Sequence, residues 1–202
     1  MYIPKINELN DLETIVAFMQ RFNFATLVTL QHHIPIATHL PFLVSLEDNK
    51  VMLHSHFAKA NKQWQHLEEQ TGLVIFSEPH AYISPRHYEK EQNVPTWNYL
   101  AVHAYGRGRL ITEEKEVFDL LEKSIQQFES DYQKQWDGLS PEYKTGMAQG
   151  IVAFELMVTD LQAKAKLSQN KQTIERQRIV ATLESSPDTN AQTIAQYMKL
   201  GL

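Results

Sequence analysis

The chain has 202 residues, 43% of them hydrophobic and 21% charged, which suits one ordinary domain and excludes collagen-like, low-complexity and largely disordered proteins. It has no Cys, which excludes disulfides, thiolate metal sites and Cys nucleophiles, and its net charge of −5 argues against a surface dominated by nucleic-acid contacts. With no apolar run near the ~18 residues of a membrane-spanning helix and no signal-peptide pattern, we expect a cytoplasmic protein.

The first part of the chain predicts a helix followed by short strands. Asn10 or Asp11 can cap a helix that continues to Met19 with apolar residues at helical spacing. Runs of β-branched and apolar residues then predict strands. These expected strands are Phe24–Leu30, Ile34–Val44, Val51–His56, Leu73–Ser77 and Ala81–Ser84, with a helix over Ala58–Gln70 between the third and the fourth.

The second part begins with a polar loop, Pro85–Pro95, that is long enough to be functional. A long strand should follow at Trp97–Ile111, in which Gly106 and Gly108 mark a bulge or a close backbone approach. The remaining expected elements are helices over Glu113–Gln135 and Pro141–Gln149, a strand over Ile151–Thr159, and a tail from Thr173 made of two helical pieces. This order is not a regular β-α-β alternation and favours a small antiparallel barrel with peripheral helices.

All nine His residues precede residue 104, so the N-terminal half is where we look for chemistry. On a strand, His54 and His56 face the same side and can converge on one ligand, with His39 from the preceding strand. Lys59 and Asn61 follow at an expected helix start, where free N–H groups favour phosphate. An anion or cofactor is favoured over a metal, because no carboxylate lies nearby in sequence; polar positions facing solvent are the alternative.

Two further polar segments are candidates for a site. Trp97 and Asn98 lie at the start of the long strand, where an aromatic ring and an amide can border a ligand or belong to the core. The run Lys166–Asn170 offers a cation, a hydroxyl and amides, which can bind a phosphate or form a polar turn. No dinucleotide, P-loop, zincin or α/β-hydrolase motif is present.

Six spaced motifs together resemble the PaiB family, whose members are described as FMN-binding negative transcriptional regulators. The resemblance covers essentially the whole chain, although Ala165 and Lys171 stand where the family has a bulky aromatic residue and an Arg. The motifs are Ala37–Pro41, His54–Asn61, Pro79–Pro85, Val94–Tyr99, Val102–Gly106 and Lys166–Asn170.

The resemblance implies an α+β protein with a mainly β core, a split β-barrel like that of pyridoxamine-phosphate oxidases, with peripheral helices. It also implies a homodimer with FMN at the subunit interface, a flavin-binding domain over residues 1–170 and a helical tail over 171–202 packed on the barrel. The positions that match a flavin site are Thr38, His39, His54, Ser55, His56, Lys59, Asn61, Trp97, Asn98, Lys166, Ser168 and Gln169.

Two functions follow from this resemblance. The first is a negative transcriptional regulator that acts through ligand binding or a partner, and the alternative is an FMN-dependent oxidoreductase whose regulatory effect is indirect. No residue is marked as a nucleophile or general base, so catalysis stays open and no metal is expected. Direct DNA binding is doubtful, because the chain stops after two tail helices without a recognition helix, and Lys199 is the one basic residue beyond Arg178.

Overall fold

A computed structural model describes residues 1–201; Leu202, the last residue of the expected tail, lies outside the described residues. The helices are α1 (Leu12–Arg21), α2 (Glu114–Phe128), α3 (Gln133–Asp137), α4 (Pro141–Ala148), α5 (Thr173–Glu184) and α6 (Thr189–Leu200). The strands are β1 (Phe24–Gln31), β2 (Ile34–Pro41), β3 (Leu43–Glu47), β4 (Lys50–Ala58), β5 (Thr71–Phe76), β6 (His80–Ile83), β7 (Thr96–Ile111) and β8 (Ile151–Lys166). No helix within residues 1–201 is both long and apolar enough to cross a membrane.

The strands form one mainly antiparallel sheet in the order β2-β1-β5-β7-β8-β4-β3, with β6 paired to β7. Over residues 1–201 this path ends at β2 and β3, so the sheet is not closed. The register places Thr26 opposite His39 and His56 opposite Ala153. Directly opposed residues point to the same face, so the register decides which side chains meet.

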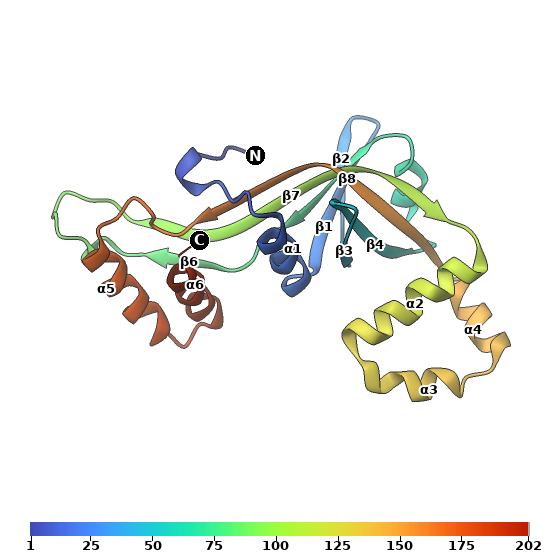
Figure 1. Ribbon diagram of the computed structural model, residues 1–202. Coiled ribbons are helices and arrows are strands. Elements are labelled where there is room, and N and C mark those ends of the chain that lie inside the picture. The colour runs from blue at the N-terminus through green and yellow to red at the C-terminus, as the bar shows by residue number, and fades with distance from the viewer. Residues whose placement is uncertain (202) are drawn as a thin grey trace. The chain divides into compact units, whose positions relative to one another are not determined.

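The chain divides into two compact units that share the long strands β7 and β8. Unit 1 comprises Met1–Ile15, Phe76–His103 and the chain from Gln162 onward, and unit 2 comprises Val16–Ile75 and Ala104–Leu161. In unit 2 the Phe57 and Phe154 rings stack with centroids 4.9 Å apart in the barrel interior. In unit 1, α5 and α6 pack on each other and α6 lies against β6 (Figure 1). Each unit therefore has its own interior.

Two helices, α1 and α6, begin at an Asp that caps the first turn. The Asp11 carboxylate accepts the backbone N–H of Thr14 at 2.9 Å at the start of α1, as the sequence predicted. Asp188 does the same for Asn190 at α6, again at 2.9 Å. The tail contains the two predicted helices, separated after Ser185.

The predicted helix over Ala58–Gln70 is wrong. Strand β4 continues to Ala58, and only a short 3-10 helix, η2 (Lys62–His66), follows. The carbonyl of Leu67 accepts the N–H of Gly108 on β7 at 3.3 Å. The Leu67 backbone therefore bonds to a strand of the sheet and not to a following helical turn. A five-residue 3-10 helix offers no phosphate site at its N-terminus, which removes that argument for Lys59 and Asn61.

Three other expected elements have different bounds. The strand Ile34–Val44 is split after Pro41, where buried Phe42 donates its N–H to the Asn23 carbonyl at 2.9 Å. The helix Glu113–Gln135 ends at Phe128, because Glu129 leaves the helical conformation at φ −159° and ψ 76°. The strand Ile151–Thr159 continues as β8 to Lys166.

The close backbone approach predicted for the long strand is confirmed at Gly106. A Cβ at this position would lie 2.3 Å from the carbonyl oxygen of Met157 and 2.5 Å from Leu156 Cδ2. Only a residue without a side chain fits there, so the neighbouring β8 strand can pack directly on the β7 backbone.

Candidate functional site

The predicted residues Thr38 and Asn61 meet in a hydrogen-bonded cluster in unit 2. The Thr38 hydroxyl donates to Gln63 Oε1 at 2.5 Å and accepts from Asn61 Nδ2 at 2.8 Å. The Asn61 Oδ1 in turn accepts the backbone N–H of Gln63 at 3.1 Å. Because these donors and acceptors satisfy one another, the cluster connects β2 to η2.

Gln63 is the centre of this cluster, and the sequence analysis missed it. Its side chain is almost fully buried, and Nε2 lies within hydrogen-bond distance of Thr29 Oγ1 (3.0 Å) and the carbonyls of Leu27 (3.2 Å) and Ile36 (3.3 Å). A helix was predicted here, in which Gln63 would have been an ordinary polar surface residue. The one available signal was its position two residues after a capping Asn.

His39 and Lys59 differ from that cluster because their side chains are exposed. The His39 ring stacks on Phe24, with centroids 6.4 Å apart. Among residues 1–201, Lys59 makes no ion pair. Of the predicted residues on β2 and just after β4, these two have donor groups available to a ligand.

The three residues of the His54-Ser55-His56 motif have separate roles. Ser55 is buried, and its hydroxyl donates to the Pro41 carbonyl at 2.7 Å, which holds β4 to the end of β2. His54 and His56 are half-buried on the opposite face. His54 Nε2 lies 3.6 Å from Glu155 Oε2. The sequence analysis did not find this carboxylate partner, because Glu155 is far from His54 along the chain.

Burial sets the protonation of this face. It lowers the pKa of His54, although the Glu155 carboxylate acts in the opposite direction, and it also lowers the pKa of His56. The hydrogen bond from Arg109 Nε, at 2.8 Å, lowers the pKa of Glu155. Both imidazoles are therefore neutral at pH 7 and the carboxylate is charged.

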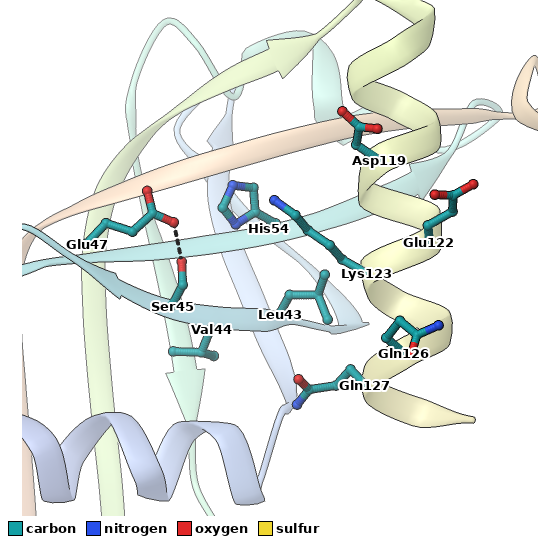
Figure 2. Close-up of a pocket in the computed structure, with 10 residues that line it drawn as sticks. All are labelled: Leu43, Val44, Ser45, Glu47, His54, Asp119, Glu122, Lys123, Gln126 and Gln127. Atoms are coloured by element: carbon teal, nitrogen blue, oxygen red, sulfur yellow. Dashed lines mark hydrogen bonds between the residues drawn. The ribbon is translucent and has the colours of Figure 1, made fainter. Parts of the chain in front are cut away.

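His54 also lines a cleft of about 620 Å³ between β3, β4 and α2. Figure 2 shows His54 on β4 and Lys123 on α2 directed into this space. The other charged side chains of its lining are all acidic: Glu47, Asp119 and Glu122. Three carboxylates against one ammonium disfavour a phosphate in this cleft.

In unit 1, Trp97 is half-exposed on β7 and belongs to an aromatic group. Its ring centroid lies 5.8 Å from those of His80 and Tyr82, both on β6. Tyr82 is also half-exposed. These rings form an apolar surface on which a planar group can stack.

Three other predicted residues of unit 1, Asn98, Lys166 and Ser168, line one cavity of about 380 Å³. Asn98 is fully buried, and its Oδ1 accepts the Ser168 hydroxyl at 3.1 Å. The Lys166 ammonium donates to Thr96 Oγ1. Gln169 does not line this cavity; its side chain bonds to its own loop, at Ala165 O (2.5 Å) and Leu167 N (2.8 Å).

Lys171 and Tyr88, both outside the predicted set, also line this cavity, which we call the lysine cavity. Lys171 Nζ donates to Asn93 Oδ1 at 3.1 Å and lies 3.7 Å from the centroid of the Tyr88 ring. The buried Tyr88 hydroxyl has no hydrogen-bond partner among residues 1–201. Tyr88 comes from the predicted Pro85–Pro95 loop, but nothing in that loop's sequence distinguished it.

The lysine cavity has the chemistry of an anion site. It is lined by two ammonium groups, by hydroxyls and by amides, and no carboxylate from residues 1–201 lines it. Ser168 has a φ of 58°, a left-handed conformation that a non-glycine residue keeps only when its surroundings impose it. A phosphate monoester fits this donor set, and the Tyr88 hydroxyl supplies one further donor.

Known proteins resemble this chain in sequence and in fold. The family model described as "Putative FMN-binding domain" matches residues 1–160. The chain is 39% identical over 202 residues to the protease synthase and sporulation protein PAI 2 of Bacillus subtilis, an alignment that covers 98% of this chain and 97% of the relative.

Two solved structures are similar in fold. The flavocytochrome Anf3 from Azotobacter vinelandii has a TM-score of 0.65 at 17% identity, covering 81% of this chain and 72% of that one. The FAD and heme binding protein from Mycobacterium smegmatis has a TM-score of 0.62 at 12% identity, covering 79% and 73%. At these identities the likeness shows the fold, and it confirms the predicted α+β split barrel.

Proposed function

Because the chain belongs to the FMN-binding domain family, we propose that it is a homodimeric FMN protein that lowers transcription through its ligand or a protein partner. Membership confirms the predicted family and its cofactor, FMN. The regulatory role follows the name of the sporulation protein that is 39% identical to this chain. The cytoplasm is the compartment we propose for it.

The lysine cavity is the observation that carries this proposal. We assign the FMN phosphate to Lys166 and Lys171, with the Tyr88 hydroxyl as a further donor; Ser168 and Asn98 line the same cavity and bond to each other. Trp97 points to the opposite face of β7 from Thr96 and Asn98, so a ring contact with it stays a separate prediction. When bound, FMN supplies the redox or sensing chemistry, while these residues bind and orient it. The flavin contacts expected on β2 and β4 stay predictions.

Exposed apolar side chains on unit 2 support the homodimer. Phe24, Leu30 and Ile34 lie on β1 and the edge strand β2 and are exposed by 67%, 49% and 65%. Monomeric proteins rarely leave an edge strand with such side chains uncovered. A mass in solution of twice 23.4 kDa, measured by light scattering, is the expected result.

We propose that regulation does not use direct DNA contact by the tail. The inner side of α6 is buried, including Ile194 and Met198, and its one basic residue, Lys199, forms an ion pair with Glu184. A groove-reading helix usually carries several basic side chains on its outer face, and α6 has only this one. A salt-sensitive, sequence-specific gel shift at nanomolar protein would refute this part of the proposal.

An FMN-dependent oxidoreductase is the second candidate. The neutral imidazoles of His54 and His56 favour it, because a neutral imidazole can accept a proton at pH 7. Bleaching of the bound flavin absorbance by NADH or NADPH, with turnover, would support the enzyme. A flavin that binds but stays oxidised would leave the regulator as the function.

The decisive experiment compares FMN with riboflavin, which lacks the phosphate. We expect the flavin-free protein to bind FMN about 30-fold more tightly than riboflavin in a fluorescence-quenching titration, because only FMN can engage both lysines. Equal affinities would refute the phosphate assignment. Binding of neither flavin would refute the cofactor itself.

A further inference from the structure

A second cavity, of about 420 Å³, lies within unit 2. It is lined by the end of β7, the start of β8, the helices α2 and α4, and the segment from Lys59 to Trp64. This volume falls in the range of small-molecule sites. It is separate from the lysine cavity, to which the FMN phosphate is assigned, and from the acidic cleft of Figure 2.

The walls of this cavity are mostly apolar. Leu110, Val117, Ala148 and Ile151 contribute aliphatic surface, and Trp64 contributes an aromatic ring. The indole N–H of Trp64 donates to the Lys59 carbonyl at 3.3 Å, which helps to fix the ring. Aliphatic walls beside a fixed indole favour a flat aromatic ligand, which gains both burial and ring contact.

One charged group of the lining is available to a ligand anion. Lys59 is exposed at the rim, makes no ion pair among residues 1–201, and has its backbone anchored by an N–H bond to the Gly150 carbonyl at 2.8 Å. The carboxylate of Glu114 accepts the Thr145 hydroxyl at 3.1 Å and lies in the first turn of α2. The Glu114 carboxylate keeps its charge but is engaged by this bond and by the helix N-terminus, whereas the Lys59 ammonium has no side-chain partner among residues 1–201 and is available to a ligand anion.

We propose that this cavity binds a planar aromatic carboxylate, with its ring against Trp64 and its carboxylate at Lys59. It is a second ligand site, distinct from the lysine cavity. Ala153 in its lining lies opposite His56 in the β4–β8 register, so the ligand lies beside the strand that carries the histidine motif. Binding here does not require bound FMN.

Calorimetric titrations of the full chain with three naphthalene probes test this site. We expect 2-naphthoate to bind at one saturable site, about fivefold more tightly than the neutral 2-naphthalenemethanol, the usual worth of one partly exposed charge pair. The cationic 2-naphthylmethylamine should bind most weakly. Tightest binding of the amine, or no saturable binding of 2-naphthoate up to millimolar concentration, would overturn the proposal.

Variants locate the binding. Ala148→Trp fills the cavity and should weaken the binding of 2-naphthoate at least tenfold. Met147→Trp, at the adjacent exposed residue outside the lining, is the control and should leave this binding unchanged. Lys59→Met should abolish the preference for the carboxylate over the alcohol while leaving the alcohol affinity unchanged. Unchanged 2-naphthoate affinity in both Ala148→Trp and Lys59→Met would refute the site.

The same samples separate this proposal from the flavin proposal. Ala148→Trp should still bind FMN with wild-type affinity, measured by flavin fluorescence. A protein that binds 2-naphthoate but no FMN would refute the cofactor and leave this cavity as a ligand site. A protein that binds FMN but no naphthalene probe would refute this ligand site and leave the flavin proposal standing.

Discussion

Two polar clusters of this molecule differ in how far their members satisfy one another. In unit 2, Thr38, Asn61 and Gln63 satisfy one another and the backbone around them. In unit 1, the lysine cavity contains two ammonium groups that make no ion pair among residues 1–201, and the unsatisfied Tyr88 hydroxyl. A satisfied buried cluster stabilises the fold, whereas an unsatisfied one has capacity left for a ligand.

This contrast predicts that the unit 2 cluster affects stability first. Gln63→Ala should lower the free energy of unfolding by about 3 kcal/mol, because it leaves the Thr38 hydroxyl and several buried acceptors unsatisfied. Chemical denaturation measures the change. Gln70→Ala is the matched control: its bonds to Leu30 lie at the surface, so it should cost less than about 1 kcal/mol. Equal losses in the two variants would contradict the comparison.

The lysine cavity should show the opposite pattern. Lys166→Met with Lys171→Met should weaken FMN binding about 30-fold, near 2 kcal/mol, and leave riboflavin affinity and the melting temperature nearly unchanged. Fluorescence titration and thermal denaturation measure the two quantities. Lys62→Met, at an exposed lysine outside this cavity, is the control and should change neither. A large drop in melting temperature with normal FMN binding would assign the lysines to stability.

The sequence predicted the proximity of Lys166 and Ser168 better than it predicted the partners of the His54-Ser55-His56 motif, and the reason is local. Lys166 ends β8 and Ser168 follows two residues later, so their proximity follows from the chain itself. The partners of His54 and Ser55 come from β8 and β2, and no spacing in the sequence reveals them.

The same limit accounts for the errors in the fold. Gly106 was identified correctly, because a glycine inside a strand usually marks a bulge or a close backbone approach. The helix expected over Ala58–Gln70 failed, because Gln63 and Leu67 are held by bonds to strands far away in sequence. Local propensity cannot include such contacts.

The half-buried His54 and His56 should make the free energy of unfolding depend on pH. We expect this effect to be smaller than those of the Gln63 and lysine variants above. Burial lowers the folded-state pKa of His54 and His56, so below the unfolded value near 6.5 the unfolded chain binds more protons. The contribution of these two neutral imidazoles to the free energy of unfolding is complete above pH 6.5. It is lost as the pH falls, by about 1 kcal/mol between pH 7 and 5. Glu155, with its pKa lowered from 4.5, loses its contribution only below that window.

Denaturation at several pH values measures this slope. His54→Gln with His56→Gln should flatten it, whereas His33→Asn, at an exposed turn residue, should leave it unchanged. Stability that rises as the pH falls from 7 to 5 would show that the Glu155 carboxylate outweighs burial at His54.

The smallest effect is the sharpest test of the lysine cavity. Tyr88→Phe removes a buried hydroxyl that has no partner among residues 1–201, so the free protein should be equally stable or gain up to about 1 kcal/mol. If the hydroxyl donates to the bound phosphate, the same variant should bind FMN a few-fold more weakly, with riboflavin unaffected. Opposite signs in stability and affinity are expected only where a polar group is kept for a ligand. A loss of stability together with unchanged FMN affinity would place the Tyr88 hydroxyl in the fold, and the contrast between the two clusters would fail there.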